Sequence, residues 1–372
     1  MISILLLSRY GRLGASSRLR SYQYLPFLET LGVHVSSCPL LSDLYLRRLY
    51  ADLRPRITDV LEGYYARIRQ LVLRRKYDLI WVEREVFPWL PAWIENGALG
   101  WRQSPWVVDL DDAIFHRYDL HRVGVVRWLL GTKIDSVMSK ANLVIVGNRY
   151  LAERARRAGA EWVEYLPTVV DLCRYPVKPE VERPIFTVGW IGTPQTVKFL
   201  GLIEGVLRTF CARHPDTQLT VIGGGRVSMP GVRVENVQWE EDREAELLGA
   251  IDVGIMPLPD GAFERGKCGY KLIQYMASQK PVIASPVGAS KAIVENGKSG
   301  FWASSESEWL GHLEHLYTDA NARRTLGAAG RSVVEQRFSL QVTGPRLAFL
   351  LCAAAGTVPN GPLTRAIWQD AE

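Results

Sequence analysis

Three aspartates lie close together at the end of an apolar run in the first half of the chain. Asp109 is the last residue of the run Trp106–Asp109, and Asp111, Asp112 and His116 follow it. Carboxylates in this arrangement could bind sugar hydroxyls, transfer protons or hold a divalent metal. Capping of a following helix by Asp111 or Asp112 is the structural alternative. His116 either orients a bound sugar or has a structural role.

A glycine–threonine turn in the second half of the chain has the composition of a phosphate site. Gly192 and Thr193 follow the apolar run Phe186–Ile191, and Lys198 stands near the start of the next helical segment. Backbone N–H groups at a helix start and a nearby cation both favour negative charge. The segment therefore predicts a diphosphate site, although a solvated helix lysine is the simpler interpretation of Lys198.

The densest group of candidates lies between Phe263 and Ala277. A polar loop that contains Glu264, Cys268 and Gly269 leads through Tyr270 into a helix, on which Lys271 and Gln274 share one face. Loop N–H groups could meet a phosphate or hexose hydroxyls. Lys271 could neutralise a diphosphate, and Gln274 could bond a ribose.

Two further segments follow apolar runs in the first half. In Gly11–Gly14, the glycines with Arg9, Arg12 and Arg18 could hold an anion, or the segment is a plain tight turn. Its order differs from the G-x-G-x-x-G pattern, which disfavours a nicotinamide site. Glu83–Glu85 either reaches a binding cleft or forms a local ion pair.

Apolar runs typical of buried parallel strands alternate with helical segments throughout the chain. The expected strands are Ile2–Ser8, Val33–Ser36, Asp78–Glu83, Trp106–Asp109, Leu143–Gly147, Trp162–Leu166, Phe186–Ile191, Leu219–Ile222, Val232–Val237, Val253–Pro257 and Pro281–Ser285. Four prolines between Pro167 and Pro184 indicate a linker. The pattern predicts two doubly wound α/β domains, 1–180 and 181–340, facing each other across a cleft. Residues 341–372 are expected to form a helix and tail that pack back towards the first domain.

Composition limits the class of protein. The chain has 372 residues, of which 47% are apolar and 23% charged, which excludes disordered and fibrous classes. Its five cysteines form no C-x-x-C pair, so we expect neither a zinc site nor a disulfide framework, and a cytoplasmic location fits best. No run reaches the ~18 apolar residues that a membrane span needs.

The net charge of +6 comes from one segment. Nine basic and three acidic residues lie between Arg47 and Lys76, and the rest of the chain has 36 of each sign. Helical periodicity from Ile57 onwards gives an apolar stripe flanked by Arg56, Arg67 and Arg74 on one side and by Arg69 and Lys76 on the other. Such a pattern is found in helices that contact an anionic membrane, which is one interpretation of the predicted helix Arg56–Lys76. The favoured interpretation is a helix packed on the first sheet with solvated arginines, because every surface helix needs an apolar stripe. No nucleic-acid partner is expected.

Six motifs together resemble those of family 4 of the retaining glycosyltransferases. They are Val146–Leu151, Leu166–Asp171, Gly189–Thr193, Ile255–Leu258, Lys271–Ala277 and Pro281–Ser285. The resemblance implies the GT-B fold of two Rossmann-like domains, with the donor held by the second domain and the acceptor by the first. It further implies transfer of a hexose from a nucleotide diphosphate sugar with retention of anomeric configuration. The nucleotide sugar is then a substrate, and neither a cofactor nor a metal is expected.

The resemblance also implies roles for individual residues. Gly14 would face the diphosphate, Lys198 would stand near the usual phosphate-binding lysine, and the backbone of Cys268–Tyr270 would contact sugar and diphosphate. Asp111, Asp112 and His116 would orient the hexose or the acceptor. Lys198 and Lys271 would stabilise the charge that grows on the leaving diphosphate.

The chain departs from the family at three positions. Gln274 and Gly266 replace the two glutamates of the usual E-x7-E motif, with Glu264 two residues early, and Trp190 replaces a common arginine. Lys271 would then take over the role of the arginine. A glutamine carries no charge, so ribose binding would be weaker or differently shaped.

The sequence therefore predicts a retaining hexosyltransferase. Its acceptor would be lipid-linked or a polysaccharide, in cell-surface glycan biosynthesis at the inner face of the membrane. Two alternatives stay open. The first is a GT-B sugar-nucleotide epimerase, and the second is a non-catalytic partner subunit that binds a sugar nucleotide.

Overall fold

The computed structural model describes residues 2–51, 53–73, 76–177 and 183–357. Its buried strands form two separate parallel sheets. The chain divides into two units. Unit 1 comprises Met1–Thr168 with Thr343–Glu372, and unit 2 comprises Val169–Val342. The predicted domain boundary at residue 180 falls later in the chain, because Val170 and Tyr175 already pack into the core of unit 2.

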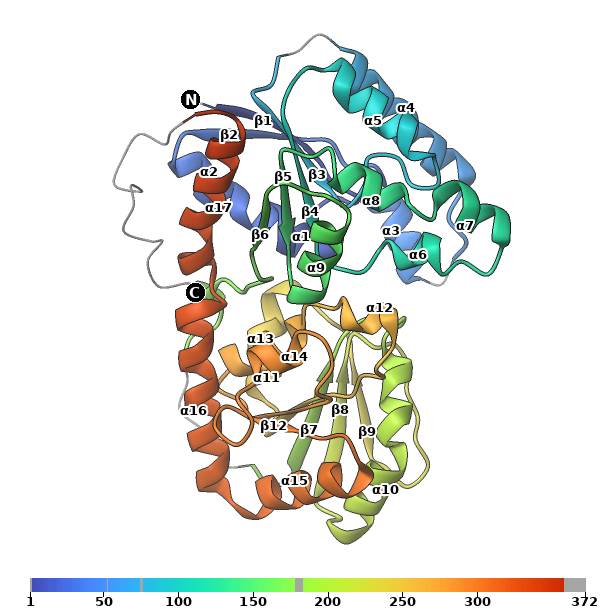
Figure 1. The fold of residues 1–372 in the computed structure, drawn as a ribbon. Helices are drawn as coiled ribbons and strands as arrows, with labels where there is room; N and C mark the ends of the chain where they lie inside the picture. Colours follow the sequence, from blue (N-terminus) through green and yellow to red (C-terminus); the bar gives the residue numbers. More distant parts are fainter. Residues whose placement is uncertain (1, 52, 74–75, 178–182, 358–372) are drawn as a thin grey trace. The chain divides into compact units, whose positions relative to one another are not determined.

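Unit 1 contains six parallel strands in the order β2-β1-β3-β4-β5-β6 (Figure 1). They are β1 (Ile2–Leu7), β2 (Val33–Ser37), β3 (Leu79–Glu83), β4 (Trp106–Leu110), β5 (Leu143–Val146) and β6 (Val163–Tyr165). Strand order reverses between β1 and β3, and ligands in open parallel sheets bind beyond the carboxyl ends of the strands at such a reversal. The register pairs Glu83 with Asp109, so these two acids lie at that edge.

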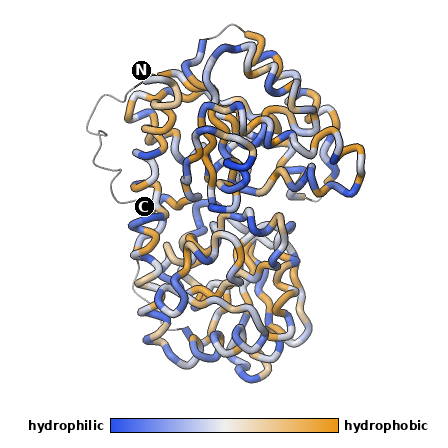
Figure 2. Tube along the Cα trace, in the orientation of Figure 1, coloured by the Kyte–Doolittle hydropathy of each residue, from blue (hydrophilic) through white to orange (hydrophobic). Residues whose placement is uncertain are grey.

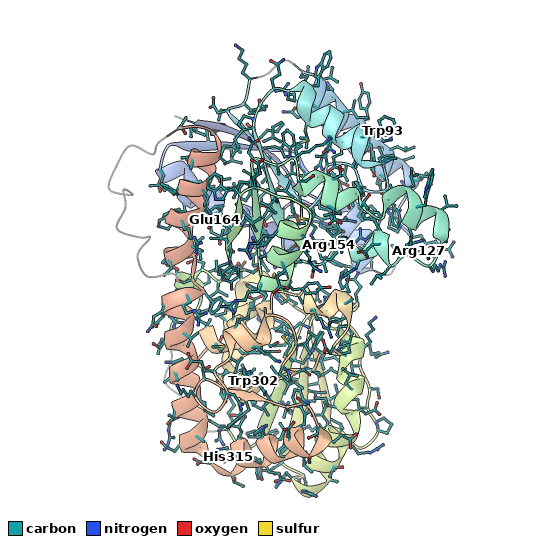
Figure 3. All side chains as sticks on the ribbon, viewed as in Figure 1. Trp93, Arg127, Arg154, Glu164, Trp302 and His315 are labelled. Atoms are coloured by element: carbon teal, nitrogen blue, oxygen red, sulfur yellow. The ribbon has the colours of Figure 1, made fainter. Side chains whose placement is uncertain are left out.

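The helices of unit 1 are mostly short. They are α1 (Ala15–Arg20), α2 (Leu25–Thr30), α3 (Asp43–Tyr50), α4 (Ile57–Val72), α5 (Ala92–Trp101), α6 (His116–Asp119), α7 (Gly124–Leu130), α8 (Lys133–Met138), α9 (Arg149–Arg157) and most of α17 (Leu340–Ala354). A 3₁₀ turn at Tyr22–Tyr24 separates α1 from α2. Thr343 on α17 hydrogen-bonds Tyr24, and Arg346 pairs with Glu164, which Figure 3 labels.

Unit 2 repeats the same winding, with the strand order β12-β11-β10-β7-β8-β9. The strands are β7 (Phe186–Ile191), β8 (Thr217–Ile222), β9 (Val234–Val237), β10 (Val253–Met256), β11 (Val282–Ala284) and β12 (Phe301–Trp302). The order reverses between β7 and β10, so the carboxyl ends of these two strands mark the expected ligand position. The two doubly wound sheets confirm the predicted α/β fold class.

The helices of unit 2 surround its sheet. They are α10 (Glu204–Arg213), α11 (Glu244–Gly249), α12 (Ala262–Arg265), α13 (Tyr270–Ala277), α14 (Ser290–Ile293), α15 (Glu306–Thr318) and α16 (Ala320–Arg337). The segment before α10 is a 3₁₀ helix, η3 (Val197–Ile203), where the sequence predicts one continuous helix from Thr196. β12 has only two residues, which is too short for an apolar pattern to reveal.

Both cores consist of the strands and the inner faces of the helices, and Figure 2 shows the hydrophobic residues along the strands. Ile4–Leu7 of β1 and Leu79–Val82 of β3 have no exposed surface, as strands covered on both faces should. No helix in the described ranges has the length and apolar composition that crossing a bilayer requires.

Candidate functional site

Helix α13 lies across the strand reversal in unit 2 and is hydrogen-bonded to both central strands, β7 and β10. Gly269 precedes α13 with φ +66°, a conformation that favours glycine. The hydroxyl of Tyr275, inside α13, accepts from the Ile191 amide of β7 at 2.9 Å and donates to the Ile255 carbonyl of β10 at 3.3 Å. The helix therefore spans the reversal, and its first turn lies at the carboxyl end of β7.

Lys271 occupies that first turn. Its Nζ donates to Thr196 Oγ1 at 3.3 Å and lies 3.7 Å from the centroid of the Trp190 ring. A Cβ at Gly192 would come within 2.4 Å of Nζ, so the glycine leaves the room that the ammonium group occupies. The structure thus brings Gly192 and Lys271 together, as the sequence leads us to expect of a diphosphate site.

The ammonium group of Lys271 has no carboxylate partner among the residues that the structure describes. Burial lowers its pKa well below the usual value, and the nearby Lys267 lowers it further. A partly buried cation without an acid beside it gains from any anion that binds there. The electrostatics of this edge therefore favour a phosphate ligand.

The other candidates in unit 2 differ in position. Thr193 lies in the same turn, where its amide donates to Thr196 Oγ1 at 3.4 Å, and Gln274 is almost wholly buried on α13. Lys198 is exposed on η3, with Nζ 5.4 Å from the Phe199 ring. The carboxylate of Glu264 lies over Gly261, in its own loop.

The loop before α13 contains the last three donor candidates. Cys268 and Gly269 are buried, and Tyr270 is partly buried at the start of the helix. A Cβ at Gly269 would lie 2.6 Å from the Ile293 side chain, so this loop packs closely on α14. The proposed contacts of these residues with sugar and diphosphate stay predictions.

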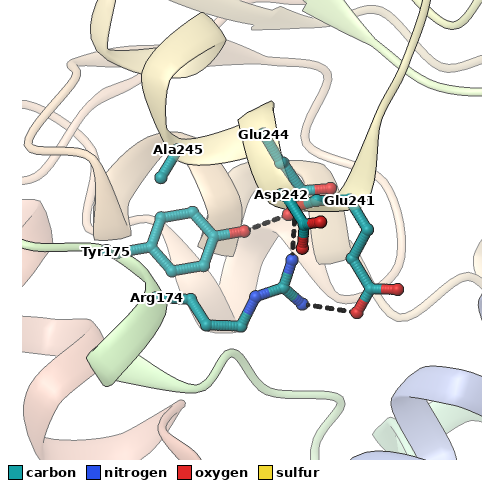
Figure 4. Close-up of a pocket in the computed structure, with 6 residues that line it drawn as sticks. All are labelled: Arg174, Tyr175, Glu241, Asp242, Glu244 and Ala245. Carbon is teal, nitrogen blue, oxygen red and sulfur yellow. Dashed lines mark hydrogen bonds and ion pairs between the residues drawn. The ribbon is translucent and has the colours of Figure 1, made fainter.

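A small hollow of about 200 Å³ adjoins this edge and contains no predicted residue (Figure 4). Arg174 donates to Glu241 at 2.9 Å, and Tyr175 donates to the buried Glu244. Glu244 also accepts from Trp239 Nε1 at 2.6 Å. A Cβ at Gly223 would touch both Trp239 and the Gly192 carbonyl, so Trp239 lies close to the Gly192 turn.

The strand reversal in unit 1 contains a dense buried network of charges. Glu83 ends β3, and its Oε2 accepts from Ser17 Oγ at 2.6 Å and from the Arg9 amide at 3.0 Å. Glu85 accepts from Lys133 Nζ at 2.6 Å and from the Tyr118 hydroxyl. Glu83, Arg84 and Glu85 are all buried, so an exposed local ion pair is the wrong interpretation of this triplet.

Arg84 links this triplet to the aspartates. It has φ +65°, a strained conformation for a residue with a side chain, and donates to Asp111 at 2.7 Å and to Asp112 at 3.3 Å. Burial raises the pKa of Asp111, but the Arg84 guanidinium outweighs that effect and the net shift is downward. Neither aspartate caps α6, which follows Phe115 without a side-chain cap, so the capping interpretation is wrong.

Asp109 is paired separately, with Arg20. The guanidinium contacts Asp109 Oδ1 through Nε at 2.9 Å and through Nη2 at 2.8 Å, and Nη1 donates to the Leu166 carbonyl at 2.8 Å. Burial raises the pKa of Asp109 to about 6, although Arg20 acts in the opposite direction. Within the described ranges, no group of three His, Cys, Asp or Glu side chains could hold a metal ion.

Two other candidates of unit 1 have structural partners. His116 Nδ1 lies 2.8 Å from Asp119, and Nε2 lies 2.7 Å from the Tyr150 hydroxyl, so both ring nitrogens are engaged. The structural role considered for His116 therefore matches its contacts. A Cβ at Gly14 would lie 2.4 Å from Tyr10 Cβ, which makes close packing a sufficient reason for this glycine.

One family model matches a part of unit 2. Residues 182–319 match the model of the family described as glycosyl transferases group 1. The match includes β7, β10 and α13. It therefore includes Lys271 and the residues around it, Trp190, Gly192 and Thr196.

A curated relative is a mannosyltransferase of Corynebacterium glutamicum. It is the GDP-mannose-dependent monoacylated alpha-(1-6)-phosphatidylinositol monomannoside mannosyltransferase, 28% identical over 214 residues. The match covers 50% of this chain and 55% of the relative, so the chain spans about half the length of that protein.

Solved structures show that the fold is GT-B. Anabaena Alr3699/HepE, in complex with UDP and glucose, has a TM-score of 0.67 at 16% identity and covers 95% of this chain and 100% of its own. Sucrose-phosphate synthase from Thermosynechococcus elongatus has a TM-score of 0.67 at 15% identity over 94% and 98%. A putative UDP-N-acetylglucosamine 2-epimerase from Listeria monocytogenes has a TM-score of 0.60 at 9% identity over 95% and 96%. The fold alone therefore does not distinguish a transferase from an epimerase.

The helix predicted to contact a membrane is α4, and its orientation differs from both interpretations. Arg67, assigned to a cationic flank, is fully buried and donates to the carbonyls of Ser8, Cys38 and Val86. Arg56, Arg69 and Lys76 are exposed, and Arg74 lies outside the described residues. The apolar stripe is divided: Leu71 is buried, whereas Ile57, Leu61, Tyr65, Ile68 and Val72 are exposed, so only one edge of the stripe packs on unit 1.

Sequence reasoning missed the two networks that depend on tertiary contacts. Glu244, Trp239 and Tyr175 come from separate segments of unit 2, and no spacing rule relates them. The central position of Arg84 has one weak signal in the sequence. It stands directly after the strand at which the order reverses, where polar residues tend to be functional.

Proposed function

We propose that this protein is a retaining glycosyltransferase that moves a hexose from a nucleotide diphosphate sugar to a lipid-linked or polysaccharide acceptor. One observation carries the donor assignment. Lys271 is a partly buried cation without a carboxylate partner in the described residues, at the strand reversal of a group 1 glycosyltransferase domain. Negative charge grows on the diphosphate as the anomeric bond breaks, and a preorganised cation stabilises that charge.

The proposed reaction follows from what these groups can do. Lys271 neutralises the leaving diphosphate. The departing phosphate oxygen takes the proton of the acceptor hydroxyl on the same face of the sugar, which keeps the anomeric configuration. No protein base is then needed, and no metal is needed to balance the charge.

In unit 1 we assign Asp111 and Asp112 to orientation of the acceptor. Both are only partly buried, and Arg84 keeps Asp111 ionised, so they can accept hydrogen bonds from sugar hydroxyls. We place the reaction at the cytoplasmic face of the membrane, in cell-surface glycan biosynthesis, where nucleotide sugars and lipid-linked acceptors meet.

The first test is a donor panel. The purified protein is incubated with GDP-, UDP- and ADP-hexoses, with lipid extract or polysaccharide as acceptor, and nucleotide release is measured. GDP-mannose and UDP-glucose head the panel because the curated relative is GDP-mannose-dependent and a structural neighbour was crystallised with UDP-glucose. We expect release that depends on acceptor, persists in EDTA and gives a product with the anomeric configuration of the donor. Absence of both donor binding and nucleotide release would overturn the proposal.

The same assay separates the alternatives. An epimerase, favoured by the likeness to the Listeria structure, would convert its donor without any acceptor. A non-catalytic sugar-nucleotide-binding subunit would show a thermal shift with donor but no turnover under any pairing.

A further inference from the structure

Helix α4 exposes its apolar stripe instead of burying it. Five large apolar side chains, spaced three or four residues apart, are exposed along one face. Their exposed fractions range from 48% at Ile68 to 75% at Ile57. The five are Ile57, Leu61, Tyr65, Ile68 and Val72. The adjacent face attaches the helix to unit 1 through Arg67, Leu71 and Tyr64. Surface helices usually turn the apolar stripe inwards, so this stripe is available to something outside unit 1.

Helices α5 and α7 add tryptophans to the same part of unit 1. Trp128 on α7 is 83% exposed, beside exposed Val125 and Leu129. Trp93 and Trp101 on α5 are exposed by 73% and 80%. Figure 3 labels Trp93, and Figure 2 shows hydrophobic positions along α4 and α7.

Contacts between side chains make these helices one surface. Tyr64 on α4 donates to the Pro88 carbonyl, and the half-exposed Trp89 next to it packs edge-on against His121, close before α7, at 5.8 Å. Arg102, at the end of α5, donates to the carbonyls of Leu71 and Leu73. Figure 1 shows α4, α5 and α7 along the same side of unit 1. We call this set the α4–α5–α7 surface.

Exposed cations belong to the same segments as the apolar side chains. Arg54, Arg56, Arg69 and Lys76 belong to α4 and its flanks, and Arg122 and Arg127 belong to the start of α7. Arg127 donates to the carbonyls of His121 and Arg122, which fixes its side chain beside α7. Tryptophan and tyrosine favour the head-group region of bilayers, and arginine and lysine favour anionic lipid.

We propose that the α4–α5–α7 surface docks on an anionic lipid bilayer, with Trp93, Trp101 and Trp128 at the level of the head groups. A second copy of the chain is a poorer occupant, because a two-fold contact would bring the same arginines face to face. The proposal goes beyond transfer of a sugar. It concerns unit 1 alone, and its test needs no enzymatic activity.

The test is vesicle flotation with the full chain. Vesicles of phosphatidylcholine with phosphatidylglycerol are compared with phosphatidylcholine alone, at low and high salt. We expect binding to the anionic vesicles that weakens with salt, and a blue shift of tryptophan emission on binding. Arg56→Gln and Arg69→Gln should each weaken binding about fivefold.

Apolar variants test the surface itself. Trp128→Ser and the double variant Leu61→Ser/Tyr65→Ser should lower binding at least tenfold, with unchanged circular dichroism because these side chains are exposed. Leu202→Ser, which alters an exposed leucine of unit 2, is the matched control and should bind as the unaltered chain does. Three outcomes would overturn the proposal: no vesicle binding, binding that ignores lipid charge, or a dimer that Trp128→Ser dissociates. Nucleotide release with a soluble acceptor, measured in parallel, reports separately on the transferase proposal.

Discussion

The two units place charged side chains at equivalent edges of their sheets but balance them differently. In unit 1, Glu83, Arg84 and Glu85 each have partners of opposite charge or hydrogen-bond donors. In unit 2, Lys271 has a hydroxyl and an aromatic ring beside it and, within the described residues, no acid. A buried network of paired charges fixes structure, whereas a cation without a counter-ion is suited to a charged ligand. This contrast predicts that substitutions of the paired charges inside unit 1 mainly change stability and that substitutions near Lys271 mainly change turnover.

The largest effect is expected from the Arg20–Asp109 pair of unit 1. Both side chains are buried, with 2% and 1% of their surface exposed, so Arg20→Met leaves Asp109 without its counter-ion. We expect a loss of about 3 to 5 kcal/mol in the free energy of unfolding. Urea denaturation is monitored through hydrogen exchange of the β4 amides. This measures the stability of unit 1 separately from that of unit 2.

The control for this variant is Glu29→Gln. It removes an exposed partner of His34 in the same unit and should cost no more than about 1 kcal/mol. Equal effects of the two variants would mean that the buried network does not stabilise unit 1.

In unit 2 the largest effect should be on turnover. Lys271→Met keeps much of the side-chain volume but removes the cation that faces the leaving diphosphate. We expect turnover to fall about 100- to 1,000-fold, as for loss of one transition-state hydrogen-bond donor, without loss of stability. Steady-state nucleotide release measures it, and Lys298→Met, at an exposed lysine of the same unit, is the control. Unchanged turnover would remove Lys271 from the site.

A smaller effect is expected from displacing Lys271 without removing it. In Gly192→Ala the new Cβ would lie 2.4 Å from Nζ and 2.6 Å from the Trp190 ring, so the ammonium group must move. We expect a fall in turnover of about 10- to 100-fold, with Gly249→Ala, at an open position, as control. Added to Lys271→Met, the substitution should cause little further loss. An additive loss would show that Gly192 acts independently of Lys271.

The sequence predicts most of the fold because buried parallel strands are continuous apolar runs. It also predicts the position of Lys271 in the first turn of a helix after a glycine loop, whereas the role of Lys271 at a diphosphate stays a prediction. It does not predict the orientation of Arg67. Helical periodicity places Arg67 on a solvent flank, whereas the carbonyls of Ser8, Cys38 and Val86, distant in sequence, hold it inside. Side chains that bond to distant backbone groups leave no periodic pattern, and the same reason hides the Trp239–Glu244–Tyr175 network.

The smallest effect is the uptake of a single proton when the donor binds. It tests most directly whether the Lys271 ammonium group pairs with the bound diphosphate. Its pKa in the free protein lies well below the usual 10.5, and a bound diphosphate should raise it again. Between the pKa of the free protein and that of the complex, donor binding must therefore take up a proton. Donor affinity should weaken as pH rises through this window, by up to about tenfold per pH unit.

Folding stability should follow the opposite trend in the free protein. The unfolded chain binds the Lys271 proton more tightly than the folded chain, so the contribution of Lys271 to stability rises with pH between the folded and unfolded pKa values. Calorimetric titration of donor in two buffers of different ionisation enthalpy measures the proton uptake, and Lys271→Met should abolish it. Equal proton uptake by that variant would assign the proton to another group. It would also contradict the proposed difference between the charges at the edges of the two sheets.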